Sequence, residues 1–238
     1  MKRMLKALLA FGLVWGSTEY SLFGSPENSS LSHDGFRRTT AVGEAASGPG
    51  IRIRIYNLAA VSQATLDRAI KEADRIFRAA GVDMEWIECG VDNQNTATAQ
   101  ECQKPAGPLA LNLRITLRYD QANPGVEDTF FGVAQPYQDG GVQAALFYQH
   151  IDSFAKAGTA SRSLLLAHAI AHEIGHLLLW SKSHSSTGIM QASWRQADLK
   201  AIEQGQLAFS PSEAESMRAN LLARQKHYQL ITASERLP

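Results

Sequence analysis

Apolar and polar residues alternate in two stretches of this chain, as they do in strands that bury one face. Isoleucines alternate with arginines over 51–55, and apolar residues fill every other position over 109–117. Shorter apolar stretches indicate three further strands, over 82–87, 130–135 and 142–149. An Asp-Gly-Gly turn at 139–141 predicts that the last two strands form a hairpin.

Helical periodicity predicts one helix between the first two strands and a second one after the last strand. The first runs from a candidate N-cap at Ser62 to about Ala80, and Gly81 ends it. The second lies within 164–180, where apolar residues cover nearly the whole circumference. A helix with that composition is buried on all sides.

Two more helices are predicted near the C-terminus from their capping residues. Ser193 and Gln196 have the spacing of a capping box for a helix to about Gln204. The stretch 210–213 opens the last helix, with Pro at its first position and Glu at its third.

The predicted fold class is α+β, with five strands, a helix that backs the sheet, a buried helix and C-terminal helices. The segment between Cys89 and Cys102 is polar and is predicted to be a surface loop pinned at its base. An even number of cysteines in an exported chain favours a disulfide between these two residues.

The first residues have the features of a secretory signal peptide, which we assign to 1–17. Three basic residues precede an apolar run of about ten residues, which is too short to span a bilayer. Residues 18–49 are rich in Ser, Gly, Thr and Ala and are predicted to be a flexible linker or short pro-segment. The domain is expected to cover 50–238, and the protein to be exported to a periplasmic or extracellular location.

Charge and composition narrow the classes of partner. Lys plus Arg and Asp plus Glu both number 23, so the formal net charge is zero. That balance argues against nucleic acid as a partner. We expect no membrane partner after signal removal, and a monomer.

Candidate chemistry is concentrated in the predicted buried helix, which contains an HExxH motif at 172–176. Residues four apart lie on the same helix face, so His172 and His176 can direct two imidazoles at one point. Glu173 lies about 100° round the helix from His172, beside a metal rather than on it. The motif therefore predicts a zinc site with Glu173 as the general base.

A third histidine and a methionine follow the motif at His184 and Met190. This arrangement resembles the metzincin clan of zinc peptidases, whose pattern is HExxHxxGxxH followed by a Met-turn. The chain departs from that pattern, because seven residues rather than five separate its second and third His. Leu179 and Trp180 occupy the region of the clan's turning Gly. Since non-Gly residues avoid positive φ, we expect the turn to be built differently.

The resemblance implies a helix-backed five-stranded mixed sheet and an exported zinc metalloendopeptidase acting on peptide or protein substrates. It implies one catalytic Zn²⁺ held by His172, His176 and His184, with Met190 as a hydrophobic floor. Glu173 would take a proton from a zinc-activated water and deliver it to the leaving amine. It also implies that the strand over 130–135 forms the upper rim of the cleft, where an extended substrate could pair with it.

Several alternatives remain open at the level of sequence. The third ligand could be a downstream carboxylate, for which Glu203, Glu213 and Glu215 are candidates. His168 lies one turn before the motif and is interpreted as a neighbour of the site or a packing residue. A zinc-binding protein without turnover and a zinc hydrolase that does not cleave peptides are the alternative functions.

Overall fold

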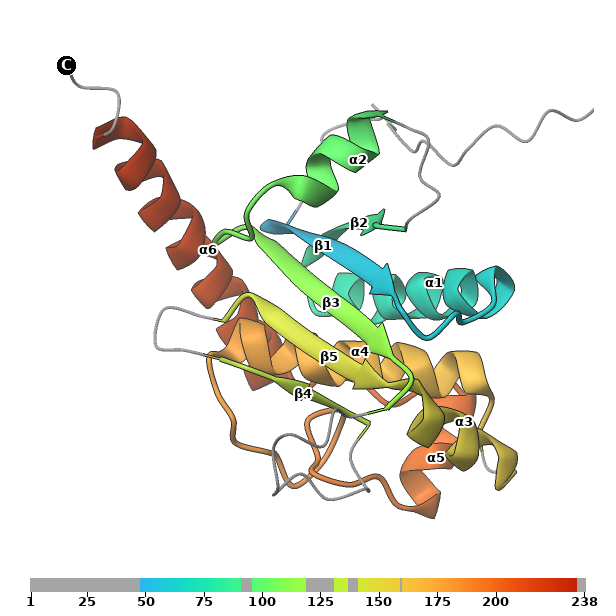
Figure 1. Cartoon of the computed structure of the whole chain (residues 1–238). Helices are drawn as coiled ribbons and strands as arrows, with labels where there is room; N and C mark the ends of the chain where they lie inside the picture. The colour runs from blue at the N-terminus through green and yellow to red at the C-terminus, as the bar shows by residue number, and fades with distance from the viewer. Residues whose placement is uncertain (1–47, 91–95, 119–130, 137–140, 159, 235–238) are drawn as a thin grey trace, which may run out of the picture. The chain divides into compact units, whose positions relative to one another are not determined.

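One mixed sheet of five strands forms the framework of the domain. The strands are β1 Gly50–Asn57, β2 Asp83–Glu88, β3 Ala110–Thr116, β4 Gly132–Ala134 and β5 Gln143–Phe147. They lie in the order β2-β1-β3-β5-β4 in the computed structural model (Figure 1). All neighbours are parallel except β4, which pairs antiparallel with β5 at the edge of the sheet. The predicted five-stranded mixed sheet and α+β class are confirmed.

The structure describes residues 48–90, 96–118, 131–136, 141–158 and 160–234. The signal at 1–17, nearly all of the linker at 18–49 and the turn at 139–140 lie outside these ranges, so those interpretations remain predictions. Within the described residues, no helix is both long enough and apolar enough to cross a membrane.

Six helices of the described chain surround the sheet. They are α1 Gln63–Ala79, α2 Thr96–Gln103, α3 Tyr148–Lys156, α4 Arg162–Leu179, α5 Gln196–Glu203 and α6 Pro211–Ser234. Figure 1 shows α1 and α4 side by side behind the sheet. The isoleucines of β1 point to that face and are almost fully buried, as the alternation over 51–55 predicts. The apolar circumference of α4 is explained by its position between the sheet and the other helices, which leaves most of its residues buried.

The surface loop predicted between Cys89 and Cys102 is wrong in part, because α2 occupies its second half. A helix of eight residues has little stability of its own. Tertiary contacts hold it: Cys102 forms the disulfide with Cys89, and its carbonyl accepts a hydrogen bond from the Tyr56 hydroxyl at 3.0 Å. The side chain of Glu101 also reaches back to the sheet. The disulfide confirms the predicted pairing, whereas the contacts of α2 with Tyr56 and Arg54 join residues distant in sequence, so local pattern could not reveal them.

The strand predicted over 142–149 is wrong beyond Phe147, where the chain enters α3. The apolar run continues across this boundary, which conceals the change from a period of two to a helical period. In α3, Ile151 is fully buried, and Asp152 pairs with Lys156 four residues later, as helix neighbours do. The strand predicted over 130–135 is shorter in the structure, since β4 has only three residues.

Two of the three predicted helix starts agree with the structure. Ser62 is the N-cap of α1. Gly81 follows the C-terminal end of α1 and has φ of 74°. Pro211 is the first residue of α6. The capping box predicted at Ser193 is wrong: α5 begins after Arg195, whose backbone N–H donates to the Asp198 carboxylate at 2.8 Å.

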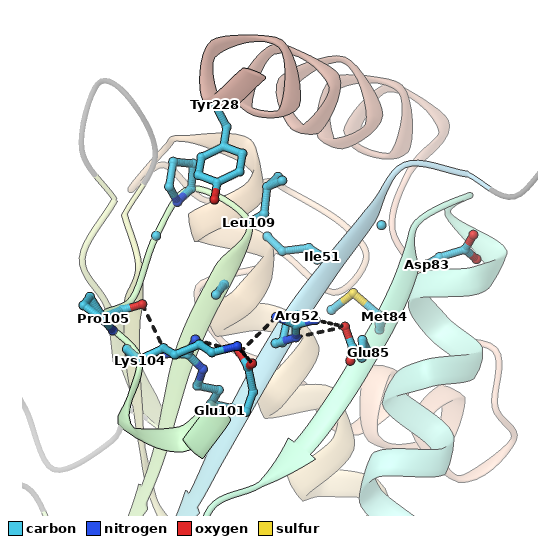
Figure 2. Close-up of a pocket in the computed structure, with 15 residues that line it drawn as sticks. Ile51, Arg52, Asp83, Met84, Glu85, Glu101, Lys104, Pro105, Leu109 and Tyr228 are labelled. Carbon is cyan, nitrogen blue, oxygen red and sulfur yellow. Dashed lines mark hydrogen bonds and ion pairs between the residues drawn. The ribbon is translucent and has the colours of Figure 1, made fainter. Parts of the chain in front are cut away.

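A charged cluster fills the face of the sheet opposite α1 and α4, beside a pocket of about 690 Å³ (Figure 2). Arg54 is buried there and donates to the carboxylate of Glu101 on α2 at 3.0 Å. Arg52 and Lys104 contact the same carboxylate at 2.9 and 2.6 Å. The arginines, the lysine and the two glutamates of this pocket therefore pair with one another, which indicates a structural role in holding α2 on the sheet.

Hydrogen bonding from Lys104 and Arg54, with the positive charge of Arg52, lowers the pKa of the Glu101 carboxyl from 4.5 to about 2. A carboxyl with a lowered folded pKa stabilises the fold fully above its unfolded pKa. We therefore expect this stabilisation to be present above about pH 4.5 and to be lost as pH falls towards about 2. Glu101→Gln should cost about 3 kcal/mol at pH 7, and much less near pH 2, in urea unfolding followed by circular dichroism.

Glu85→Gln is the matched control, because the side chain of Glu85 is 59% exposed and pairs with Arg52 at the surface. Its cost should stay below about 1 kcal/mol at both pH values. Equal costs for the two variants at pH 7 would contradict the assignment of the half-buried Glu101 as the anchor of α2.

Candidate metal centre

The HExxH residues lie in the C-terminal half of α4, on the side that faces β4 and the loop after the helix. His176 and Glu173 are buried, and His172 is half-buried. Polar side chains on a largely apolar, buried helix are costly unless each has a partner. Their contacts therefore determine what the site can do.

The Nε2 atoms of the two motif histidines face each other, and neither carries a proton. Each Nδ1 lies 2.8 Å from a backbone carbonyl, that of Ile189 for His172 and that of Ser181 for His176. A carbonyl only accepts, so each Nδ1 carries the proton and each Nε2 keeps a lone pair. Burial lowers the pKa of His172 to about 4 and also lowers that of His176, so both rings are neutral at pH 7.

The ring of His184 completes the cluster from the loop. Its centroid lies 5.3 Å from that of His172 and 4.9 Å from that of His176. One ring nitrogen from each of the three residues lies within 4.8 Å of the other two. The structure thus brings together the three histidines that the sequence analysis singled out. No carboxylate belongs to this group in the described part of the chain.

The donor set fits a zinc ion. The two Nε2 atoms lie 3.1 Å apart, and two corners of a tetrahedral zinc–imidazole site would lie about 3.3 Å apart. Two lone pairs facing each other at this distance repel unless a cation lies between them. Neutral imidazoles with Nδ1–H bound to a carbonyl are the usual orientation for zinc ligands.

The turn after α4 is made by a residue other than glycine in a left-handed conformation. Trp180 has φ of 55° and ψ of 33°, which corrects the expectation that a chain without glycine here would turn in another way. This conformation costs about 1 to 2 kcal/mol for a residue with a Cβ. Arg224 of α6 lies over the indole at 5.8 Å and donates to the carbonyl of Leu177, while Asn220 donates to Leu178 at 3.0 Å. Helix α6 therefore offsets the cost and caps α4.

The Met-turn is hydrogen-bonded to the first histidine. The carbonyl of Ile189 accepts from His172 at 2.8 Å and from the Trp194 indole at 3.2 Å. Met190 is buried, and a Cβ built on Gly175 of the motif would lie 2.7 Å from its sulfur. The fourth position of the motif's HEIGH is thus glycine because the methionine packs directly on the helix there.

Glu173 points towards β4. A Cβ built on Gly132 would lie 2.8 Å from Cγ of Glu173 and 2.6 Å from the carbonyl oxygen of Ala145, so only glycine fits between them. Burial raises the pKa of the Glu173 carboxyl to about 8. A nearby cation would favour the carboxylate and oppose this effect. Glu173, the candidate base, therefore lies beside an edge strand. Its pKa depends on whether the three histidines bind a cation.

The other residues that the sequence suggested for the site have different contacts. His168 is fully buried, and its Nδ1 lies 2.8 Å from the Leu164 carbonyl, so it packs beside the site without joining the three rings. Glu203 accepts from the backbone N–H of Ser161 at the start of α4. Glu213 is buried at the start of α6, and Glu215 is exposed.

Sequence reasoning missed two residues that shape the site. The ring of Trp194 lies 6.1 Å from that of His172, and its N–H donates to the carbonyl of Ile189 in the Met-turn, although nothing in the local sequence marks this residue. Arg224 lies 40 or more residues beyond the motif, and its contacts with the end of α4 have no local signature. Both act through tertiary contacts that no periodicity encodes.

The fit at Gly132 generates a prediction. Gly132→Ala places a methyl group against a backbone carbonyl that cannot move without shifting β5, and against the stem of Glu173. We expect a loss of about 2 kcal/mol in unfolding free energy, measured by thermal and urea denaturation. The three atoms nearest to that methyl group belong to Ala145, Leu146 and Glu173 rather than to a histidine, so stoichiometric metal binding should persist.

Gly107→Ala serves as the control, because no atom lies within 4 Å of the Cβ built there. It should unfold within about 0.5 kcal/mol of the wild type. If Gly132→Ala also left the unfolding free energy unchanged, the close packing of β4 on Glu173 would be refuted.

Comparisons with known proteins give structural neighbours only. No family model and no curated protein sequence matches the chain. A zinc-dependent peptidase from Methanocorpusculum labreanum is similar with TM-score 0.48 and 18% identity, over 69% of this chain and 99% of that one. An archaemetzincin from Methanopyrus kandleri has TM-score 0.49 and 14% identity, over 74% and 98%. Metalloproteinase-II from Bacteroides fragilis has TM-score 0.42 and 12% identity, over 75% and 55%.

Proposed function

We propose that this protein is a zinc-dependent metallopeptidase. The observation that carries the proposal is the pair of unprotonated Nε2 atoms 3.1 Å apart, with the ring of His184 beside them and Glu173 next along the helix. Such a donor set holds one divalent cation and has a carboxylate adjacent to it. A closed structural site has no use for that carboxylate, so the arrangement favours catalysis over zinc storage.

His172, His176 and His184 would hold the zinc ion. When bound, zinc supplies Lewis acidity, which lowers the pKa of water to about 7 and polarises a carbonyl oxygen. Glu173 accepts a proton from the attacking water and carries it to the leaving amine. Its stem packs against Gly132 of β4, so the carboxylate lies next to the edge strand. Trp194 and the Met-turn keep His172 in the tautomer that binds metal.

The edge strand β4 supplies a place for an extended peptide. In the pairing of β4 with β5, Val133 lies opposite Ala145. Two residues before and two residues after Val133, backbone hydrogen bonds join Phe131 to Phe147 and Gln135 to Gln143. Since bonded and non-bonded pairs alternate in an antiparallel ladder, the N–H and C=O groups of Gly132 and Ala134 point away from β5. A peptide could add to this edge by backbone hydrogen bonds, passing Glu173.

Export to a periplasmic or extracellular location is part of the same proposal. The basic and apolar start of the chain supports it, and so does the disulfide between Cys89 and Cys102, which persists in oxidising compartments. A peptidase placed there would act on peptides outside the cytoplasm.

Metal analysis combined with a peptidase assay tests the function. The purified wild type should hold one zinc per chain and hydrolyse peptides from a mixture monitored by mass spectrometry. His184→Ala should lose tight zinc binding, because two imidazoles remain. Glu173→Gln should keep the zinc and lose peptidase activity by about 100-fold or more.

Glu85→Gln makes the same chemical change at the exposed Glu85 of β2 and should alter neither zinc content nor cleavage. Full activity of Glu173→Gln would remove the proposed role of Glu173. A wild type that binds no zinc would end the proposal.

The substrate strand makes a separate prediction. Ala134→Pro removes an outward backbone N–H from an edge strand, where proline is tolerated. We expect kcat/KM for peptides to fall about tenfold, since one hydrogen bond to the substrate is lost, while zinc content and Tm stay close to those of the wild type. Ala134→Ser retains the N–H and should cleave normally. Unchanged kinetics in Ala134→Pro would show that peptides do not pair with β4 at this residue.

A further inference from the structure

The three histidines of the cluster are held in unequal ways. His172 and His176 belong to a buried helix, and each Nδ1 has a carbonyl partner. His184 is exposed and lies in the loop between α4 and the Met-turn. In the described part of the chain its ring makes no hydrogen bond. The position of this third ring therefore depends on how its backbone is tied down.

Ser185, the next residue, supplies two ties. Its backbone N–H donates to the carbonyl of Met190 at 2.8 Å, as part of a short parallel bridge with Gln191. Its hydroxyl donates to Oε1 of Glu213 on α6. The first tie joins the loop to the Met-turn, and the second joins it to a helix that begins 26 residues further along the chain.

Glu213 is suited to hold this hydroxyl. Its side chain is 8% exposed, and its other oxygen, Oε2, accepts from the backbone N–H of Ser210 at 2.7 Å. Its own N–H donates to the Ser210 hydroxyl at 3.3 Å, which completes a capping box. The third position of a helix also favours a negative charge. The carboxylate is thus fixed by α6, with one oxygen left for Ser185.

We propose that Glu213 is a positioning residue for the metal site, which acts through Ser185 to hold His184 towards the other two rings. The sequence raised Glu213 as a possible ligand, and its contacts assign it this different task. The inference rests on the proposed zinc site, since it concerns the geometry of one of its ligands. Helix α6 then holds His184 in position and also caps α4.

Zinc affinity of the full chain, measured by competition with a chromophoric chelator, tests the tether. Ser185→Ala removes the hydroxyl and leaves the capping box of α6 intact, so it should weaken zinc binding about 10- to 100-fold. Ser210→Ala is the matched control: it removes a cap contact but spares the bond between Ser185 and Glu213. It should lower Tm while changing zinc affinity less than about threefold.

Two further variants separate positioning from ligation. Ser185→Thr keeps a hydroxyl and should restore affinity to within about threefold of the wild type. Glu213→Ala should weaken binding as Ser185→Ala does, and the double variant should weaken it no further, because both changes break one contact. If Glu213 were a ligand, Glu213→Ala would match His184→Ala, and Ser185→Ala would match the wild type.

The visible spectrum of the cobalt-substituted protein gives an independent signature. Ser185→Ala should shift the cobalt absorption of the wild type towards that of His184→Ala, while Ser210→Ala should leave it unchanged. Wild-type affinity and spectrum in Ser185→Ala, or equal losses in Ser210→Ala, would overturn the tether and leave the proposed function intact. A wild type that binds neither metal would refute both.

Discussion

Everything at this site depends on two imidazole nitrogens that both lack a proton and lie 3.1 Å apart. The protons are placed on the opposite ring nitrogens by the carbonyls of Ile189 and Ser181, which are backbone groups of the chain after the helix. A side-chain acceptor could rotate away, whereas a carbonyl in a packed turn cannot. The metal site is therefore prepared by the course of the backbone, and the apolar surroundings keep both rings neutral.

The turn that returns Ser181 to His176 places a tryptophan where glycine would be free of strain. A left-handed tryptophan persists only when neighbouring contacts hold it. Here the contacts come from α6, whose Arg224 lies over the indole and bonds to the last turn of α4. Interactions between the last helix and the end of α4 thus replace the conformational freedom of a missing glycine.

Sequence reasoning succeeded where geometry is local and failed where contacts are tertiary. Helical spacing alone brings His172 and His176 to one face, and alternation alone identifies β1 and β3. His184 was placed by resemblance to a motif, because its loop has no periodicity. Helix α3 was missed because an apolar run crosses from strand to helix at Phe147, and α2 because its anchors lie on the sheet. The contacts of Trp194 and Arg224 could be found only in three dimensions.

Helix α6 contributes Glu213, Asn220 and Arg224 to the surroundings of the histidines, and it is the last element of the described chain to leave the ribosome. Before α6 has docked, the loop with the third ring has its bond to the Met-turn but lacks its bond to Glu213. The order of elements along the chain therefore makes the docking of α6 the step that fixes the third histidine.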